Sequence, residues 1–219
     1  MATFTATANS ASTIGYAQYG STSWSTGTAN GACQGAYQGT TASQSRVGVM
    51  VFSDAGVALN GKIITQIQLT ITSSTAGSGS SDKILSFRKA NYQALQTGIV
   101  GSAQVGAALG TLTGTFYNNT ASHIVSSTTN AALFEALKAY LTAGNSVLVL
   151  YNGETSSSSG YSTNYARVTS CTITVTYIDA TVWYLNGATW VQCTVWYFLS
   201  GTWIQCVPWY NSGGTWIRV

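Results

Sequence analysis

Few side chains in this sequence could do acid–base or nucleophilic chemistry. The 219 residues contain one histidine, His123, and five carboxylates, which are Asp54, Asp82, Glu135, Glu154 and Asp179. A glycosidase needs two carboxylates about 5–9 Å apart, and no two of these acids fall close together on one candidate strand. A Ser-His-Asp site would have to use His123, which follows a polar loop at the start of a strand. We therefore expect no enzymatic activity and interpret His123 as a structural or surface residue.

The sequence also lacks metal-binding and redox patterns. It contains no GxSxG, HExxH or GxxxxGK[ST] motif, and its four cysteines, Cys33, Cys171, Cys193 and Cys206, show no CxxC spacing. We interpret the cysteines as small buried residues. Asp54 and Asp82 are the candidates for a Ca²⁺ site, but both sit in Gly/Ser-rich stretches where turn aspartates are common. We expect no metal and no cofactor.

Charge is scarce in this chain. Charged residues make up 6% of it and the net charge is +3, against roughly 25% charged residues in an ordinary soluble domain. The basic residues do not cluster, which argues against nucleic-acid binding. No apolar run approaches the ~18 residues of a membrane span, and the N-terminus has no Sec-type signal pattern. A protein with such an uncharged surface and no export signal fits a virion component that is made in the cytoplasm and released by lysis. A secreted protein whose signal peptide has been removed is the alternative.

Alternation of apolar and polar residues predicts β-strands along most of the first 178 residues. In Ile63–Thr72, the side chains of Ile67, Leu69 and Ile71 share one face, as in a half-buried antiparallel strand. Cys171 to Tyr177 repeats this pattern. The six strand candidates are Arg46–Phe52, Ile63–Thr72, Lys83–Arg88, Thr111–Tyr117, Ser146–Tyr151 and Arg167–Ile178.

One segment has helical spacing instead. In Thr129–Ala143, apolar residues recur every three or four positions, a Ser/Thr/Asn cluster precedes them as a cap, and Gly144 follows as a stop. The sequence therefore predicts an all-β protein: an antiparallel β-sandwich (jelly roll) over residues 1–179, with one helix covering an end or edge.

The order of these elements resembles a known family. Ile64-Thr65-Gln66-Ile67-Gln68-Leu69-Thr70-Ile71 and the closing strand Thr169–Tyr177 are similar to two strands of the DNRLRE-type β-sandwich, a jelly roll related in shape to carbohydrate-binding modules. The closing strand here lacks the family's proline. The resemblance covers roughly residues 45–178. It implies a scaffold found in surface-anchored and phage-associated proteins, with no binding residue carried over.

The last forty residues contain a repeat. Six of the seven tryptophans occur there at a spacing of thirteen residues, as the series Trp183, Trp196, Trp209 and the series Trp190, Trp203, Trp216. Each unit has a turn candidate between its tryptophans, at Asn186-Gly187, Leu199-Ser200 and Ser212-Gly213. Residues 180–219 are thus predicted to form three β-hairpin repeats. The units resemble W-Y-x-N-G-x-x-W-V repeats at the C-termini of tailed-phage structural proteins.

Two-residue turns at those positions would fix the pairing of the tail strands. Trp183 would lie opposite Trp190, Trp196 opposite Trp203 and Trp209 opposite Trp216, in one four-stranded sheet. Two aromatic ladders would form on one face: Trp183, Trp190, Trp209 and Trp216 in one, and Tyr177, Trp196 and Trp203 in the other. Cys193 would face Cys206 at a spacing that suits a disulfide, although assembly in the cytoplasm would leave both thiols reduced, and the reduced state is favoured slightly.

A face of this kind must pack against something, and three partners are open. It packs on the sandwich, on identical tails of other copies (a trimer included), or on sugars that stack on the indole rings. We expect a non-enzymatic virion structural or adhesion protein of a tailed phage: a fibre, tail-tip or head-surface component that contacts itself and other virion proteins. A carbohydrate-binding module or adhesin for cell-surface glycans is the first alternative, and an extracellular filament subunit is the second.

Overall fold

The computed structural model describes residues 1–9, 14–19, 24–27, 31–38, 43–74, 82–90, 105–154, 160–178, 182–186, 189–193, 196–199, 201–205, 209–212 and 215–218. Over these residues the chain is an antiparallel β protein with two helices, α2 (Ala55–Ala58) and α3 (Ala131–Thr142). The strands of the main body are β1 (Ala2–Asn9), β2 (Ile14–Tyr19), β3 (Trp24–Gly27), β4 (Ala32–Gln38), β5 (Ser43–Val51), β6 (Ile63–Ser73), β7 (Lys83–Ala90), β8 (Val105–Gly114), β9 (Thr120–Val125), β10 (Val147–Leu150), β11 (Gly160–Tyr161) and β12 (Ala166–Ile178).

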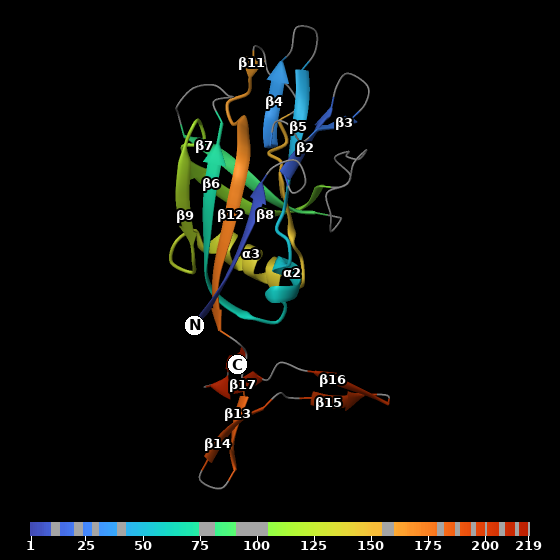
Figure 1. The fold of residues 1–219 in the computed structure, drawn as a ribbon, viewed down its shortest axis with the longest axis vertical. Coiled ribbons are helices and arrows are strands. Elements are labelled where there is room, and N and C mark those ends of the chain that lie inside the picture. Colours follow the sequence, from blue (N-terminus) through green and yellow to red (C-terminus); the bar gives the residue numbers. More distant parts are fainter. Residues whose placement is uncertain are drawn as a thin grey trace.

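The main body is sandwich-like, with two layers of strands. One layer consists of β1, β12, β6 and β9, and the other contains β2, β5, β10, β7 and β8. Strand β4 joins the layers, because it pairs with both β12 and β5. Figure 1 shows β9, β6 and β12 side by side, with strands of the second layer crossing behind them. The continuous path of paired strands begins at β8 and ends at β9, so these two strands are its free edges.

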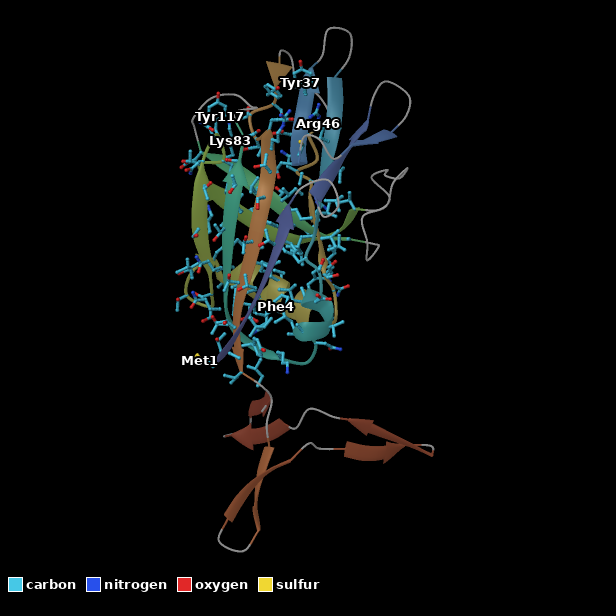
Figure 2. The ribbon with its side chains drawn as sticks, in the orientation of Figure 1. Met1, Phe4, Tyr37, Arg46, Lys83 and Tyr117 are labelled. Carbon is cyan, nitrogen blue, oxygen red and sulfur yellow. The ribbon has the colours of Figure 1, made fainter. Side chains whose placement is uncertain are left out.

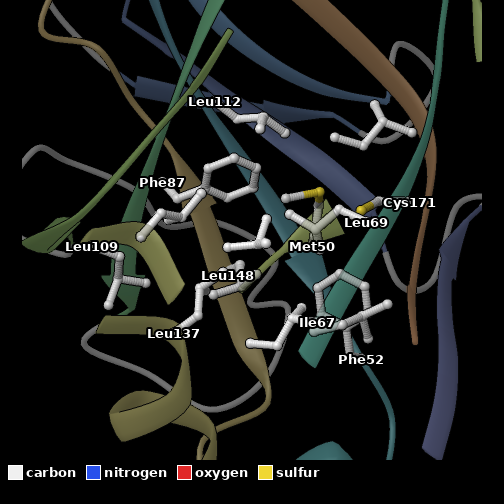
Figure 3. Packing of buried hydrophobic residues seen from close by; sticks show 14 of the residues in the cluster. Met50, Phe52, Ile67, Leu69, Phe87, Leu109, Leu112, Leu137, Leu148 and Cys171 are labelled. Carbon is white, nitrogen blue, oxygen red and sulfur yellow. The ribbon is translucent and has the colours of Figure 1, made fainter. Parts of the chain in front are cut away.

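The alternation predicted for the long strands is confirmed. In β6, Ile67, Leu69 and Ile71 are buried and the residues between them are partly exposed. In β12, Cys171, Ile173 and Val175 are buried in the same way and lie directly opposite the three β6 residues. Together with Met50, Phe52, Phe87 and Leu148 from other strands, they form the core between the layers (Figure 3).

The outer face of the first layer carries rows of hydroxyl groups. Threonines of β1 pair with threonines of β12, as in Thr7 and Thr172, whose Oγ1 atoms are 2.9 Å apart. A second row joins β6 to β9, where the hydroxyl oxygens of Thr70 and Ser122 are 2.8 Å apart. Uncharged hydroxyls therefore supply the polar surface of this layer.

The predicted helix is confirmed as α3, which covers the end of the core. Leu133, Phe134, Leu137 and Leu141 are buried, and Tyr140 ties the helix to both neighbouring strands. The Tyr140 hydroxyl accepts a hydrogen bond from the Ala90 N–H at 3.1 Å and donates to the Val147 carbonyl at 2.7 Å. The helix thus packs against the second layer through both apolar and polar contacts.

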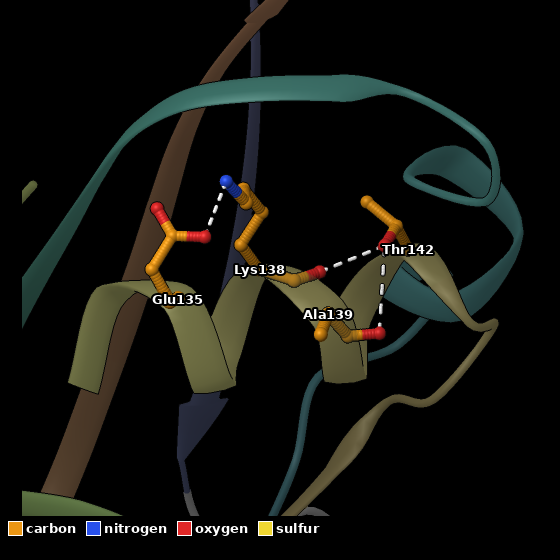
Figure 4. Close-up of polar contacts among 4 residues, drawn as sticks. All are labelled: Glu135, Lys138, Ala139 and Thr142. Atoms are coloured by element: carbon orange, nitrogen blue, oxygen red, sulfur yellow. Dashed lines mark hydrogen bonds and ion pairs between the residues drawn. The ribbon is translucent and has the colours of Figure 1, made fainter. Parts of the chain in front are cut away.

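The ends of α3 follow the prediction only in part. Gly144 follows the helix with φ +88°, the left-handed conformation expected of a glycine stop. The expected side-chain cap at the N-terminus is wrong, because Asn130 has φ 56° and makes no capping bond. Its amide instead donates to the Thr111 carbonyl of β8 at 2.8 Å. On the exposed side of the helix, Glu135 pairs with Lys138 at 2.5 Å and Thr142 donates to the Lys138 carbonyl (Figure 4).

All six predicted strands are present, with shifted ends in some cases. The largest difference is at Thr111–Tyr117, where β8 starts earlier, at Val105, and ends at Gly114. Phe116 leaves the strand to enter the core, and Asn118 adopts φ 45° in the following turn. Sequence reasoning expects a strand at His123, where β9 lies, but it does not single out β1, β2, β3, β4 and β11 or the short helix α2.

Candidate functional site

The repeats at the end of the chain form three separate two-stranded sheets among the described residues. Their strands are β13 (Val182–Asn186) with β14 (Thr189–Cys193), β15 (Trp196–Leu199) with β16 (Thr202–Gln205), and β17 (Trp209–Ser212) with β18 (Thr215–Arg218). The prediction of one hairpin per thirteen-residue unit agrees with this pairing. The prediction of a single four-stranded sheet does not, because each hairpin pairs only within itself in the described part of the tail.

The predicted register of the hairpins is wrong by two residues. Trp183 pairs with Gln192, Trp196 with Gln205 and Trp209 with Arg218, whereas Trp190, Trp203 and Trp216 pair with Leu185, Phe198 and Asn211. In every unit the turn lies one residue further along than predicted, because the last paired residues are Asn186–Thr189, Leu199–Thr202 and Ser212–Thr215. The two tryptophans of a unit therefore lie diagonally across the hairpin from each other and are not directly opposed. Their side chains lie outside the described part of the molecule.

Tyr177 does not belong to an aromatic ladder of the tail. It is paired on both sides within the sandwich, with Ala2 of β1 and Ile64 of β6. Its ring is partly buried against the core and lies under the ammonium of Lys62, 5.6 Å from the ring centroid. The predicted ladder of Tyr177, Trp196 and Trp203 is therefore wrong.

The cysteines divide between the core and the tail. Cys33 and Cys171 are buried, as predicted, and burial raises the pKa of the Cys171 thiol to about 12. In the tail, Cys193 pairs with Val182, and the β15–β16 pairing ends at Trp196 and Gln205. Cys206 lies outside the described residues, so the disulfide between Cys193 and Cys206 remains a prediction.

The carboxylates are dispersed over the described body. Asp54 starts α2 with φ 65°, and Asp82 accepts a hydrogen bond from the Thr115 hydroxyl at 2.8 Å. Glu135 pairs with Lys138 on α3, and Glu154 accepts a hydrogen bond from the Ser162 hydroxyl. Asp179 lies outside the described residues. Within the described ranges, no three His, Cys, Asp or Glu side chains come together as a metal site would require.

A cluster of three tyrosines and one arginine, which sequence reasoning does not predict, lies at the end of the sandwich opposite Met1. Tyr37 of β4, Tyr161 of β11 and Tyr165 stack in series, with ring centroids 4.8 and 4.4 Å apart. Arg46 of β5 lies against the first and last rings, with Cζ 5.7 Å from the Tyr37 centroid and 5.6 Å from that of Tyr165. Figure 2 shows Tyr37 and Arg46 at this end. We call these four residues the tyrosine–arginine cluster.

Hydrogen bonding and burial make this cluster a structural element. Arg46 Nη1 donates to the Tyr165 hydroxyl at 2.8 Å, and both side chains are buried. Burial raises the pKa of Tyr165 well above its usual value, with the nearby Cys33 thiol adding to the effect, so the phenol stays protonated. A neutral phenol that accepts a hydrogen bond from a guanidinium holds the strands together, but it provides neither a general base nor a nucleophile.

Two further buried polar side chains next to this end also have partners. Gln34 donates to the carbonyls of Ile84 and Asn164 at 2.6 and 2.9 Å and accepts from the Ser86 N–H at 2.9 Å. Lys83 is almost fully buried, and its Nζ donates to the Thr163 carbonyl at 2.8 Å. These bonds connect β4, β7 and the segment before β12, so they fix the geometry of the sandwich end.

His123 lies at the open edge of the core, beside a cleft. It is on β9, opposite Leu69 of β6, and its ring centroid is 5.3 Å from that of Phe116. Gly114 leaves room for this ring, since a Cβ at that position would come 2.7 Å from His123 Cε1. The half-buried position agrees with a structural histidine. Desolvation lowers the pKa of the imidazole, so the ring is neutral near neutral pH.

The cleft itself encloses about 590 Å³ between the two free edges. Residues 111–113 of β8 form one wall, residues 122–124 of β9 form the other, and residues 129 and 130 close one end. Its lining contains hydroxyls, an amide, an imidazole and two aliphatic side chains, but no carboxylate, lysine or arginine. Such a lining suits binding of a neutral polar ligand better than acid–base catalysis.

No protein-family description matches the chain, and no curated protein is significantly similar to it in sequence. The similarity to the DNRLRE-type sandwich and to phage repeats therefore stays a prediction. The described helices include none that is long and apolar enough to cross a membrane.

Proposed function

We propose that this protein is a non-enzymatic structural component that assembles with copies of itself through its C-terminal hairpins. One observation carries the proposal: the tail forms three hairpins that each pair only within themselves among the described residues. A single two-stranded hairpin is at best marginally stable in water. These hairpins therefore need a partner surface, and other tails provide one of matching chemistry.

The residue content of the hairpins supports the same proposal. Each unit has two tryptophans and a tyrosine, at positions repeated every thirteen residues. A buried aromatic side chain removes roughly 150–250 Å² from water, at about 25 cal/mol per Å². Association of identical tails would bury these rings, and the repeat would let equivalent hairpins of several copies meet in the same way. A trimeric stem is one arrangement that satisfies this requirement.

The setting we propose is the virion of a tailed phage, as a fibre, tail-tip or head-surface component. The low charge, the hydroxyl-covered outer face and the Trp-rich repeats support this setting together. The sandwich would then be the exposed part, and the tail would hold it to its neighbours. A genomic neighbourhood of portal and tail genes is the expected finding, and a neighbourhood of unrelated metabolic genes would contradict the setting.

Light scattering on the full chain tests the assembly proposal. We expect the unsubstituted protein to be a homo-oligomer and the triple variant Trp190→Ala, Trp203→Ala, Trp216→Ala to be monomeric with an unchanged circular dichroism signal from the sandwich. The matched control is Trp24→Ala, which removes the one tryptophan outside the tail and should leave the oligomer intact. An unsubstituted chain that is monomeric at high concentration would disprove the proposal.

A further inference from the structure

The cleft between β8 and β9 has main-chain groups exposed on both walls. On β8, the Thr111 carbonyl accepts a hydrogen bond from the Asn130 side chain, which approaches from the cleft. Thr111 is paired with Ser86 of β7. The Ser86 N–H donates to the Gln34 side chain and the Ser86 carbonyl accepts from the Tyr151 N–H, so both groups point away from β8. Thr111 and Ser86 are therefore a non-hydrogen-bonded pair, and the N–H and carbonyl of Thr111 point into the cleft.

The main-chain groups of Thr113, two residues further along β8, have the same orientation as those of Thr111. It is paired with Ile84, whose N–H donates to Asn164 and whose carbonyl accepts from Gln34, again on the far side of β7. The main-chain groups of Thr113 therefore also point away from β7. The wall formed by β8 thus presents alternate peptide groups, at residues 111 and 113, to the cleft.

On the β9 wall, the main-chain groups of alternate residues also point away from the paired strand. The Ser73 N–H of β6 donates to the Asn119 carbonyl, so residue 119 is turned toward β6. Pairing alternates along antiparallel strands, which turns residues 120, 122 and 124 of β9 to the free side. Ser122 and Ile124 line the cleft. Among the described strands β9 pairs with β6 alone, so its edge can accept a further strand, whereas the Thr111 carbonyl on the β8 edge is already bonded to Asn130.

The rest of the lining restricts the occupant to an uncharged chain. No carboxylate, lysine or arginine lines the cleft, so a charged segment entering it would lose hydration without gaining an ion pair. His123 lines it too, and its Nε2 atom is buried with no hydrogen-bond partner in the described structure. This chain is itself almost free of charge, with 13 charged residues in 219, from 8 Lys and Arg and 5 Asp and Glu. Most of its own extended segments are uncharged and meet this requirement.

We infer that the cleft is a strand-addition site, in which an extended uncharged segment of a second copy of this chain lies along β9 and extends its sheet. Exposed sheet edges commonly bind peptides in this way, with main-chain hydrogen bonds supplying the affinity. Thr111 and Thr113 form the opposite wall of the site, and Ile124, which is 50% exposed, is available for an apolar contact. The inference rests on the assembly function proposed above and adds a second contact, separate from the tail.

The probe is a set of short overlapping fluorescent peptides tiled over the sequence of this chain, titrated into the full-length protein. We expect one or more uncharged peptides to bind. Ile124→Lys should weaken that binding by about tenfold or more, because it places a charge at the edge of the cleft. Ser122→Pro should have a similar effect, because it removes an N–H that faces the cleft without removing a main-chain bond to β6; the Thr70–Ser122 hydroxyl contact is lost as well. The matched control is Ile178→Lys, at another exposed isoleucine (39%), with binding unchanged.

The outcomes separate this site from the tail. Peptide binding that survives in the monomeric tryptophan variant and is lost in Ile124→Lys supports the cleft. If no peptide of this chain binds, or if binding is the same in Ile124→Lys and Ile178→Lys while thermal melts stay normal, the inference is overturned. Binding of neutral oligosaccharides on a glycan array, lost in Ile124→Lys in place of peptide binding, also overturns it. In each of these cases the light-scattering result for the tail stands independently.

Discussion

Most buried polar side chains among the described residues have specific partners, whereas His123 Nε2 is one of several buried side-chain nitrogens without one. Gln34 makes three hydrogen bonds and Lys83 donates to a carbonyl, although both are almost fully buried. A buried polar atom without a partner costs about 1–3 kcal/mol. His123 Nε2 is such an atom, and the neutral state of the ring limits that cost because no charge is buried with it.

The lowered pKa of His123 predicts a pH-dependent stability. Burial lowers the pKa of the folded state below the ordinary value of 6.5. As the pH falls through 6.5, the unfolded chain takes up a proton that the folded protein does not, so the free energy of unfolding decreases. The decrease ends once the pH is below the pKa of the folded state. Urea denaturation at about pH 7.5 and about pH 5.5 measures the difference.

The variant His123→Gln provides the comparison for this titration. His123 is the only histidine in the chain. The free energy of unfolding of the variant should therefore differ much less between the two pH values than that of the parent protein. Carboxylates contribute little in this range because their ordinary pKa values lie near 4. If the free energy of unfolding falls equally in the variant and the parent protein between the two pH values, His123 is not the titrating group.

At the residue scale, the alternation of apolar and polar residues predicted which side chains of the long strands are buried. The buried faces of β6 and β12 follow from the spacing of Ile67, Leu69, Cys171 and Ile173, because side chains alternate between the faces of a strand. The tyrosine–arginine cluster could not be predicted in this way. Its members come from three segments of the chain, at residues 37, 46 and 161–165, and the pairing of β4 with β11 and β5 brings these segments together.

Elements in this fold meet closely where glycine allows it. Gly56 of α2 contacts the segment after α3: a Cβ on Gly56 would lie 2.3 Å from the Gly144 carbonyl oxygen and 2.8 Å from its carbonyl carbon. Both atoms are main chain, so neither can move aside by rotating a side chain. Gly144 in turn has the positive φ that ends α3. Two glycines thus set the distance between the helices.

Substitution of Gly56 by alanine should therefore destabilise the protein. We expect a loss of about 1–3 kcal/mol in the free energy of unfolding, because the added methyl group forces the two backbones apart. The control is Val57→Ala in the same helix, where the side chain is 85% exposed and the effect should stay within about 0.5 kcal/mol. Chemical denaturation measures both variants, and equal effects would contradict the packing argument.

The tail shows how far local signals determine an element. The thirteen-residue repeat predicted three hairpins, and the pairing of β13 to β18 agrees with that number. The turn dipeptides predicted their register, and that register is wrong by two residues in all three units. Asn186-Gly187 is a strong turn signal, yet Asn186 is still paired, with Thr189. The preference of a dipeptide for a turn therefore does not by itself fix the register of these hairpins.

At the scale of the whole molecule, the polar surface depends on hydroxyls instead of charges. Rows of Thr and Ser cover the outer face of β1, β12, β6 and β9, with hydroxyl pairs such as Thr7–Thr172 and Thr70–Ser122. Ion pairs contribute little by comparison, since the Glu135–Lys138 pair lies on the exposed side of α3. Hydrogen bonds between neutral groups are not screened by salt, whereas surface ion pairs are.

Stability should therefore depend weakly on ionic strength. We expect the free energy of unfolding to change by less than about 1 kcal/mol between about 0.05 and 0.5 M NaCl. The double variant Glu135→Ala, Lys138→Ala should behave as the parent protein does at both salt concentrations. Urea, which is uncharged, is the suitable denaturant. A change of several kcal/mol would indicate that charge interactions dominate the fold.

The strand that leads from the sandwich into the tail is also its most extensively bonded one. Strand β12 runs for 13 residues and pairs with β1 on one side and with β6 on the other, with β4 added at its far end. Figure 1 shows it running the length of the sandwich before the hairpins begin. A pull on the tail therefore acts along the axis of β12 and loads its ladders in shear, so that many bonds must yield together. A tether attached there would resist force well, which is what the proposed assembly through the tail would require.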